Sequence, residues 1–458
     1  MRDVLAAVGL GAASGVLGVA AYRFRWAWLG WLALAPLAAA VYLYSPLLAG
    51  LAAGVCGILL AAGNRQMSRP WVYCGARRDE TLVALLHALL WAGVFALAAW
   101  AWPDGVPGWG ALVIPAAAVA ISLAWRTMGA PRYQSWFLGT QDGVLPVVHV
   151  ARAGTELVIP ALLALSAAVP VILLVQRPPS GAAVGAAAAA AVVIAAALAF
   201  GRASYRRAID RAGRGQPLRV AAVSASPAVF DVYGGPPHVP GYSDVDATIG
   251  RYQPHIASAI ARGARLIVLP EYAVIVSAGN RQQWLAALSR WARQASAPVV
   301  SGVIEPDKNQ LVIADQTGAI AVTYDKQHPA PGLEPRPGRR TPPALLPGTP
   351  LPLCAVQCVD LDYPDLIRPV SRAGGVLAVP VDDWKEITGM HHRSAVWSAV
   401  MAGVPVVRSA GHGISSVYDS AGRVVATADS LDGPVVLVAD VGAAHPGKAA
   451  SQTLSAAA

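Results

Sequence analysis

Charged side chains are scarce in this sequence. Only 13% of its 458 residues are Asp, Glu, Lys or Arg, whereas an average soluble domain carries about a quarter. Hydrophobic residues make up 55% of the chain, and the mean hydropathy is +0.48. This composition excludes a purely soluble enzyme and predicts that part of the chain lies in a membrane.

Lysine is the rarest charged residue, and its distribution divides the chain. All four lysines lie after residue 300, whereas residues 1–200 contain 17 charged side chains and no lysine. We therefore predict two parts joined end to end. The predicted divisions are a transmembrane domain over 1–201, a basic junction over 202–217, a catalytic domain over 218–445 and a C-terminal tail over 446–458.

Cysteine is also rare, and the four cysteines do not form the pattern of a disulfide framework. Cys56 and Cys354 are interpreted as small buried hydrophobic residues. Because Cys354 and Cys358 lie four residues apart on a predicted strand, a metal or disulfide pair is conceivable there.

The net charge is +9, but the arginines stand singly or in pairs at the ends of apolar runs. Cations at such places are attracted to lipid head groups. The sequence therefore predicts a membrane bilayer as a partner and no nucleic acid.

Seven apolar runs precede residue 202, each close to the roughly 20 residues that a helix needs to cross a bilayer. They cover approximately residues 4–22, 26–44, 46–63, 82–102, 109–126, 155–176 and 182–201. The sequence thus predicts a multi-pass α-helical membrane domain of about seven helices.

After the basic junction, short apolar strands alternate with amphipathic helices. Strands are predicted within 218–226, 264–273, 297–305, 310–318, 320–328, 351–360, 375–383, 404–413, 414–422 and 424–428. Helices are predicted over 243–263, 280–296, 363–373 and 391–402, with a loop over 329–350. This alternation is typical of an α/β sandwich.

Three of these strands end in side chains whose chemistry is complementary. Glu271 follows an apolar strand, a position that suits a general base. The ammonium of Lys326 can stabilise an oxyanion, and the thiol of Cys358, placed beside a base, becomes a strong nucleophile. Together they offer a base, an oxyanion partner and a nucleophile.

Three segments resemble the nitrilase, or carbon-nitrogen hydrolase, superfamily. They are LPEYA (269–273), YDKQHPAPGLEP (324–335) and CVDLDYP (358–364), in this order and after a multispan membrane region. Within the superfamily they look most like the apolipoprotein N-acyltransferases. In the membrane half, WLALAPLAA (31–39) and QSWFLGTQDGVLPVVHVARAG (134–154) are similar to the second span and an external loop of those enzymes. The resemblance implies a multispan membrane domain followed by a nitrilase-like αββα sandwich.

The resemblance also assigns site residues. The family's catalytic triad would fall on Glu271, Lys326 and Cys358. The acyltransferase pattern Tyr-x-Lys-x-His-Leu-Val-Pro-Phe-Gly-Glu is matched at Tyr324, Lys326, His328, Pro331 and Glu334, which makes Glu334 the family's second essential glutamate. The residues implied to position the substrate are Glu334, Tyr324, His328, Asp360, Trp384 and His392.

The implied activity is transfer of an acyl chain from phospholipid, through a thioester on Cys358, to the N-terminal amine of a diacylglyceryl-cysteine lipoprotein. No cofactor and no metal are implied. The implied location is the inner (cytoplasmic) membrane, with the catalytic domain periplasmic or extracytoplasmic. The arginine distribution by itself would place that domain in the cytoplasm, but we favour the family's arrangement because 134–154 resembles an external loop.

The sequence departs from the acyltransferases at several places. The family's Cys-Tyr-Glu is Cys358-Val359-Asp360 here, its Asn before Gly-Ile is replaced by Gly411-His412, and residues 441–458 are short, small and polar where the family has a last transmembrane helix. A membrane-tethered carbon-nitrogen hydrolase (amidase) with water as acceptor therefore stays open. So does a catalytically inactive domain that serves as an assembly platform.

Two polar clusters are open to more than one interpretation. Asp382, Asp383 and Trp384 could line the pocket below the nucleophile or cap the helix that follows, since Asp is a favoured N-cap. His391, His392 and His412 could suggest zinc, but the usual ligand spacing is missing. We favour polar residues at helix ends for these histidines.

Overall fold

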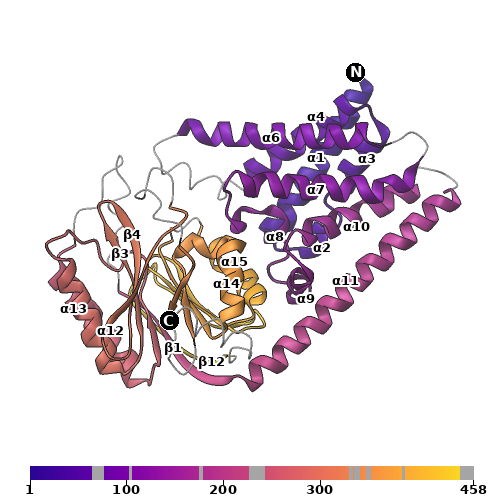
Figure 1. Ribbon diagram of the computed structural model, residues 1–458. Coiled ribbons are helices and arrows are strands. Elements are labelled where there is room, and N and C mark those ends of the chain that lie inside the picture. Colours follow the sequence, from indigo (N-terminus) through magenta and orange to yellow (C-terminus); the bar gives the residue numbers. More distant parts are fainter. Residues whose placement is uncertain are drawn as a thin grey trace. The chain divides into compact units, whose positions relative to one another are not determined.

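The computed structural model describes residues 1–63, 77–102, 106–174, 179–225, 243–329, 334, 341–346, 352–383 and 387–443. The chain forms two compact units, which meet in the sequence between Tyr205 and Arg206. Figure 1 shows helices alone in the first unit and strands with helices in the second.

The first unit is built from apolar helices. They are α1 (Arg2–Arg23), α2 (Ala27–Gly30), α3 (Ala35–Leu43), α4 (Pro46–Gly63), α6 (Arg77–Trp100), α7 (Gly110–Thr127), α8 (Trp136–Gly139), α9 (Leu145–Val148), α10 (Val158–Leu174) and α11 (Gly181–Arg214). Small residues let some of them approach closely, as is common between membrane helices. A Cβ on Gly11 of α1 would lie 2.0 Å from the backbone oxygen of Ala52 in α4.

Four helices among the described residues are long and apolar enough to cross a membrane, namely α1, α4, α7 and α11. The bent pair Leu145–Ala153 and Val158–Leu174 could make a fifth span. Shorter apolar helices cover Ala27–Leu43 and Ala84–Trp100. The described residues are therefore compatible with a membrane protein, and the total of about seven spans stays a prediction.

Helix α11 contains both the last apolar run and most of the segment predicted as a separate basic junction. Ala and Arg are both strong helix formers, so the helix continues from one composition into the other until Arg214. The first strand then begins at Gln216.

The second unit contains two six-stranded sheets. One has the order β12 (Val435–Ala443), β1 (Gln216–Ser224), β2 (Leu266–Val268), β3 (Val299–Glu305), β4 (Lys308–Ala314) and β5 (Ile320–Asp325). The other has the order β11 (Val424–Asp429), β10 (Ile414–Tyr418), β9 (Val406–Ala410), β8 (Val376–Val381), β7 (Leu353–Ala355) and β6 (Ala344–Leu346).

Four helices cover the outer faces of these sheets. Helices α12 (Val245–Ala261) and α13 (Arg281–Ala295) lie on one side of the sheet pair, and α14 (Pro364–Ala373) and α15 (Thr388–Ala402) lie on the other (Figure 1). Tyr252, Trp284 and Trp291 are buried between the first pair of helices and the β1 sheet. A second cluster of mostly aliphatic side chains, including Val220, Val300 and Val407 from both sheets, fills the space between the sheets. The predicted αββα sandwich is confirmed.

Two strands were not expected from the sequence. Strand β6 lies inside the predicted loop 329–350, where it pairs with β7. Strand β12 pairs with β1 along its whole length, from Gln216 opposite Ala443 to Ser224 opposite Val435. Strand β6 has only three residues and lies in a proline-rich segment, so its local signal is weak. Strand β12 is rich in valine, which favours strands, and its local signal was overlooked.

The carboxyl ends of the parallel strands lie at one edge of the sandwich. Strands β1, β2 and β3 are parallel in one sheet, and β7, β8 and β9 are parallel in the other. Open α/β sheets place ligands outside the carboxyl ends of such strands. The loops after β2, β7 and β8 are therefore where the chemistry of this unit is expected.

A glycine in β3 allows the loop after β2 to approach. Gly302 N–H donates to Pro270 O at 3.0 Å, and a Cβ on Gly302 would lie 1.9 Å from the backbone oxygen of Glu271. No side chain fits at that distance without moving the Glu271 loop.

We therefore expect Gly302→Ala to lower the free energy of unfolding by about 1–3 kcal/mol, because overpacking forces the backbone apart. The matched control is Gly250→Ala in α12, where an added Cβ meets nothing within 4 Å and should stabilise the helix by about 0.5–1 kcal/mol. Unfolding of the detergent-solubilised full chain measures both. Equal stability of Gly302→Ala and wild type would contradict the close approach.

Candidate active site

Lys326 lies between two carboxylates at the carboxyl edge of the strands. Its Nζ donates to Glu271 Oε1 at 2.7 Å and to Glu334 Oε1 at 2.7 Å. The side chains of Lys326, Glu271 and Glu334 are 2%, 1% and 8% exposed. The ammonium is therefore withdrawn from solvent and compensated by two partners, as a buried charge requires.

The backbone fixes both members of the Glu271–Lys326 pair. Glu271 N–H donates to Val381 O at 3.3 Å, which ties the loop after β2 to the end of β8 in the other sheet. Lys326 N–H donates to Asn309 O at 2.9 Å, which continues the β4–β5 pairing by one residue. The two charged groups thus meet at the end of one sheet, where Glu271 follows β2 and Lys326 follows β5, and the contact with Val381 anchors Glu271 to the other sheet.

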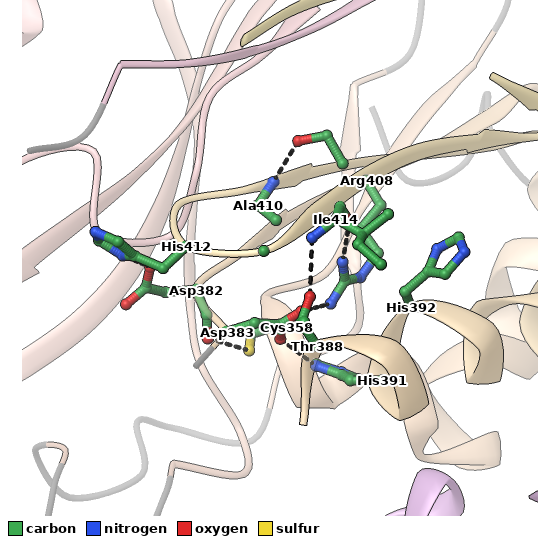
Figure 2. A network of polar contacts seen from close by, with 12 residues as sticks. Cys358, Asp382, Asp383, Thr388, His391, His392, Arg408, Ala410, His412 and Ile414 are labelled. Atoms are coloured by element: carbon green, nitrogen blue, oxygen red, sulfur yellow. Dashed lines mark hydrogen bonds and ion pairs between the residues drawn. The ribbon is translucent and has the colours of Figure 1, made fainter. Parts of the chain in front are cut away.

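Cys358 begins a short 3-10 helix, Cys358–Asp362, just after β7. Its φ is +49°, a left-handed conformation that a residue with a side chain rarely adopts and that often marks a functional position. The Cys358 thiol donates to Asp382 O at 3.9 Å (Figure 2). The predicted strand end is therefore a sharp turn that fixes the direction of the sulfur.

The backbone of Asp382 contacts both Glu271 and Cys358. Its N–H donates to Glu271 Oε2 at 3.2 Å, and its carbonyl accepts the thiol of Cys358. One residue after β8 thus brings Glu271 and Cys358 to the same place. The predicted set of base, ammonium and thiol is assembled.

Two amide side chains that were not predicted from the sequence support Glu271, one directly and the other by holding the first. Asn309 Nδ2 donates to Glu271 Oε1 at 2.8 Å, and Gln357 Nε2 donates to Asn309 Oδ1 at 2.8 Å. Both amides are buried. An Asn inside a strand is unfavourable by propensity, so Asn309 in β4 was the one signal available.

Asp360 clamps the Lys326 segment to the turn of Cys358. Its carboxylate accepts from Tyr324 Oη at 2.8 Å, from the backbone N–H of Gln327 and of His328 at 2.9 Å each, and from His328 Nδ1 at 2.8 Å. Burial and the charge of Asp360 raise the pKa of Tyr324, which keeps its hydroxyl as a donor. Substrate positioning by Tyr324, His328 and Asp360 stays a prediction, whereas their mutual contacts are structural.

The surrounding charges set the protonation of the site. Burial by itself lowers the pKa of Lys326, but Glu271 and Glu334 outweigh it and hold that pKa well above its usual range. Burial and then Glu271 raise the pKa of Cys358, and Lys326 opposes them only in part. The resting site therefore holds an ammonium and a neutral thiol, and the thiol needs a base when it reacts.

The two remaining predicted positions are Trp384 and His392. Trp384 lies outside the described residues. His392 of α15 contacts Tyr418 of β10, whose hydroxyl donates to the His392 backbone oxygen at 2.9 Å. Its predicted role with substrate stays a prediction.

A second polar network supports the end of β8. Asp383 contacts Arg408 and, at 2.7 Å, His391 Nδ1, and Arg408 Nη1 donates to Ile414 O at 2.6 Å (Figure 2). Burial would raise the pKa of Asp383, but Arg408 and His391 lower it to about 2. Breaking such a buried pair costs several kcal/mol, so Arg408 fixes the chain directly after Asp382.

The open interpretations of these polar clusters can now be compared with the structure. Helix α15 begins after Ile387 without a side-chain cap, so Asp382 and Asp383 do not cap it. Among the residues that the structure describes, no group of three or more His, Cys, Asp or Glu could hold a metal ion. The described cysteines are free thiols, so Cys354 and Cys358 form no disulfide.

A buried thiol that shares its surroundings with a carboxylate and an ammonium is the arrangement expected of a cysteine-dependent active site in an α/β domain. Residues 219–445 match the family model described as carbon-nitrogen hydrolase. The second unit is therefore a carbon-nitrogen hydrolase domain, and the protein carries an enzyme domain of the nitrilase superfamily.

Several solved structures resemble this chain. The amidase NitN from Nesterenkonia sp. AN1 is 20% identical and has a TM-score of 0.41, with 48% of this chain and 92% of that chain covered. Another structure of an amidase from Nesterenkonia sp. is 19% identical, with a TM-score of 0.42 and coverage of 52% and 95%. A mutant amidase from Nesterenkonia sp. AN1 in complex with butyramide is 20% identical, with a TM-score of 0.43 and coverage of 50% and 93%. No curated protein matches the chain.

The charges around Cys358 predict opposite shifts in its reactivity. Lys326→Met removes the group that lowers the pKa of Cys358, and Glu334→Gln removes one that raises it. Since alkylation by iodoacetamide follows the thiolate, its pH curve should move up by about one pH unit in Lys326→Met and down in Glu334→Gln. Peptide mass spectrometry measures the rate at Cys358.

Cys354 provides the internal control for this titration. Burial raises its pKa to about 12, so its alkylation should stay slow and equal in all variants. Shifts of Cys358 in the same direction in both variants would contradict the electrostatic account.

Proposed function

We propose that this protein is a membrane acyltransferase, which moves an acyl chain from a phospholipid through a Cys358 thioester to the N-terminal amine of a diacylglyceryl-cysteine lipoprotein. The observation that carries the proposal is the combination of a carbon-nitrogen hydrolase domain with four or five helices that could cross a membrane. A water-soluble amide needs no such helices, whereas a lipid donor and a lipid-anchored acceptor both reside in a bilayer. We further propose the inner membrane, with this domain outside the cytoplasm.

The first half-reaction begins at Oε2 of Glu271, the carboxylate oxygen that accepts fewer hydrogen bonds among the contacts described. Oε1 accepts from Lys326 and Asn309, whereas Oε2 accepts only a longer 3.2 Å bond from Asp382 N–H among the contacts described. Oε2 takes the proton of the Cys358 thiol. The thiolate attacks the ester carbonyl carbon of the phospholipid and forms a tetrahedral intermediate.

Lys326 stabilises the oxyanion of this intermediate. An ammonium has three donors, and Glu271 and Glu334 take two of them. Among the described residues no further acceptor contacts this ammonium, and its third N–H can donate to the developing negative charge, where a preorganised donor in a site shielded from water contributes most. Collapse breaks the C–O bond, the leaving lysophospholipid alkoxide takes the proton from Glu271, and a thioester remains on Cys358.

The second half-reaction uses the same groups in reverse. The α-amine of the acceptor attacks the thioester carbonyl, Glu271 takes a proton from that amine, and Lys326 again holds the oxyanion. Collapse breaks the C–S bond, forms the amide and returns the proton to the sulfur of Cys358. Glu334 positions Lys326 for both halves because it binds the ammonium throughout.

The match to the carbon-nitrogen hydrolase family supports a second candidate, an amidase in which water takes the place of the amine. The same triad would form a thioester from a small amide and release ammonia. A catalytically inactive assembly platform is the third, and it would not depend on Cys358 or Glu271.

Incubation with phospholipid should add one acyl chain to the protein, because the thioester accumulates when no acceptor amine is present. Intact mass measures the adduct. We expect it to disappear in Cys358→Ala and to persist in Cys354→Ala, the matched variant of the other buried cysteine in this domain. Ammonia release from small amides without any lipid adduct would favour the amidase. A wild-type phenotype in cells that carry Cys358→Ala and Glu271→Ala would favour the platform.

The acceptor is tested on a lipoprotein made in cells with and without this protein. The mass of its N-terminal peptide should be greater by one acyl chain when the protein is present. Cells that carry only Cys358→Ala should yield the lighter peptide. An N-terminus that stays unacylated in the presence of an active wild-type protein would exclude a lipoprotein acceptor.

A further inference from the structure

A buried carboxylate and imidazole lie beside the catalytic groups without a part in the proposed reaction. His412 Nδ1 and Asp382 Oδ1 are 2.9 Å apart, and the two side chains are 10% and 4% exposed. In Figure 2, His412 and Asp382 lie on one side of Cys358, and Arg408 and His391 lie on the other. The pair is thus separate from the Asp383 network.

The turn between β9 and β10 fits closely onto the end of β8. Gly411 N–H donates to Val381 O at 2.9 Å, and a Cβ on Gly411 would lie 2.2 Å from Asp382 Oδ1. A Cβ on Gly413 would lie 2.2 Å from Thr388 Oγ1. The two glycines therefore let the turn approach so closely that His412 reaches the carboxylate of Asp382.

Asp382 connects this pair to the chemistry through its main chain. Its N–H contacts Glu271 and its carbonyl contacts Cys358. A small rotation of this residue would lengthen both contacts at once, and displacements of about 1 Å in a catalytic constellation can cost up to about 100-fold in rate. The contact of the Asp382 side chain with His412 opposes that rotation.

We propose that His412 is a positioning residue, whose imidazole holds the Asp382 carboxylate and so fixes the backbone that contacts the general base and the nucleophile. The inference rests on the proposed function only in taking Cys358 as the nucleophile. His412 affects Glu271 and Cys358 through Asp382 and takes no direct part in the proposed reaction.

The charges around Asp382 make the pair sensitive to pH. Burial raises the pKa of Asp382, the hydrogen bond and charge of His412 lower it, and Asp383 and Glu334 raise it, with a net increase. Glu271 and Cys358 also contact this residue, through its main chain. The charge of His412 therefore favours the negative form of Asp382.

The test follows alkylation of Cys358 by iodoacetamide against pH in the full-length protein, read as the mass of the Cys358 peptide. His412→Phe keeps a ring but loses the hydrogen bond and the charge. We expect its plateau rate to fall about tenfold and its pH midpoint to rise by roughly 0.5–1 unit. Asp382→Asn, which removes a negative charge near the sulfur, should lower the midpoint.

His412→Gln, which keeps a side-chain N–H donor, should regain part of the plateau rate, and it replaces His412→Phe in the comparison if the latter fails to fold. His255→Phe on α12 is the control and should match wild type. A folded His412→Phe protein with wild-type plateau and midpoint would overturn the proposal. Midpoints that move in the same direction in His412→Phe and Asp382→Asn would also overturn it.

This readout separates the inference from the proposed function. Iodoacetamide reports on the activation of Cys358 whatever the acyl donor is. A wild-type protein that forms no adduct with phospholipid but shows the expected dependence on His412 would refute the acyltransferase and support the positioning role.

Discussion

The catalytic domain depends on one buried ammonium. Lys326 is held at 2.7 Å by Glu271 and at 2.7 Å by Glu334, and an ammonium withdrawn from water is tolerated only when such partners compensate it. Its charge in turn offsets part of the repulsion that the two carboxylates exert on a Cys358 thiolate. The cation thus permits two acids and a nucleophile to share a small, water-shielded volume.

The main chain brings the reacting groups together across the two sheets. Glu271 follows a strand of one sheet, whereas Cys358 and Asp382 follow strands of the other, and the peptide groups of Asp382 join them. Arg408 and His391 hold the next residue, Asp383, from β9 and α15. Because the Asp382–Glu271 contact joins the two sheets, the position of Glu271 relative to Cys358 depends on the packing between the sheets.

The two units cover their apolar side chains in different ways. The helices of the first unit have apolar surfaces that only a bilayer or another apolar partner can cover, and small residues such as Gly11 allow them to approach. The second unit buries aromatic and aliphatic side chains in its own two cores. The proposed lipid substrates would explain why such a domain is joined to apolar helices.

The sequence by itself determined the division into an apolar and a polar part and the sandwich class, because hydrophobic periodicity is a local signal. Strand-end chemistry also predicted Glu271, Lys326 and Cys358 as site residues. The sequence did not reveal the pairing of β12 with β1, which joins distant segments, nor the amide of Asn309, nor the pairing of His412 with Asp382. Only the tertiary structure decided these, since a hydrogen bond between residues 30 or more positions apart leaves no periodic trace in the chain.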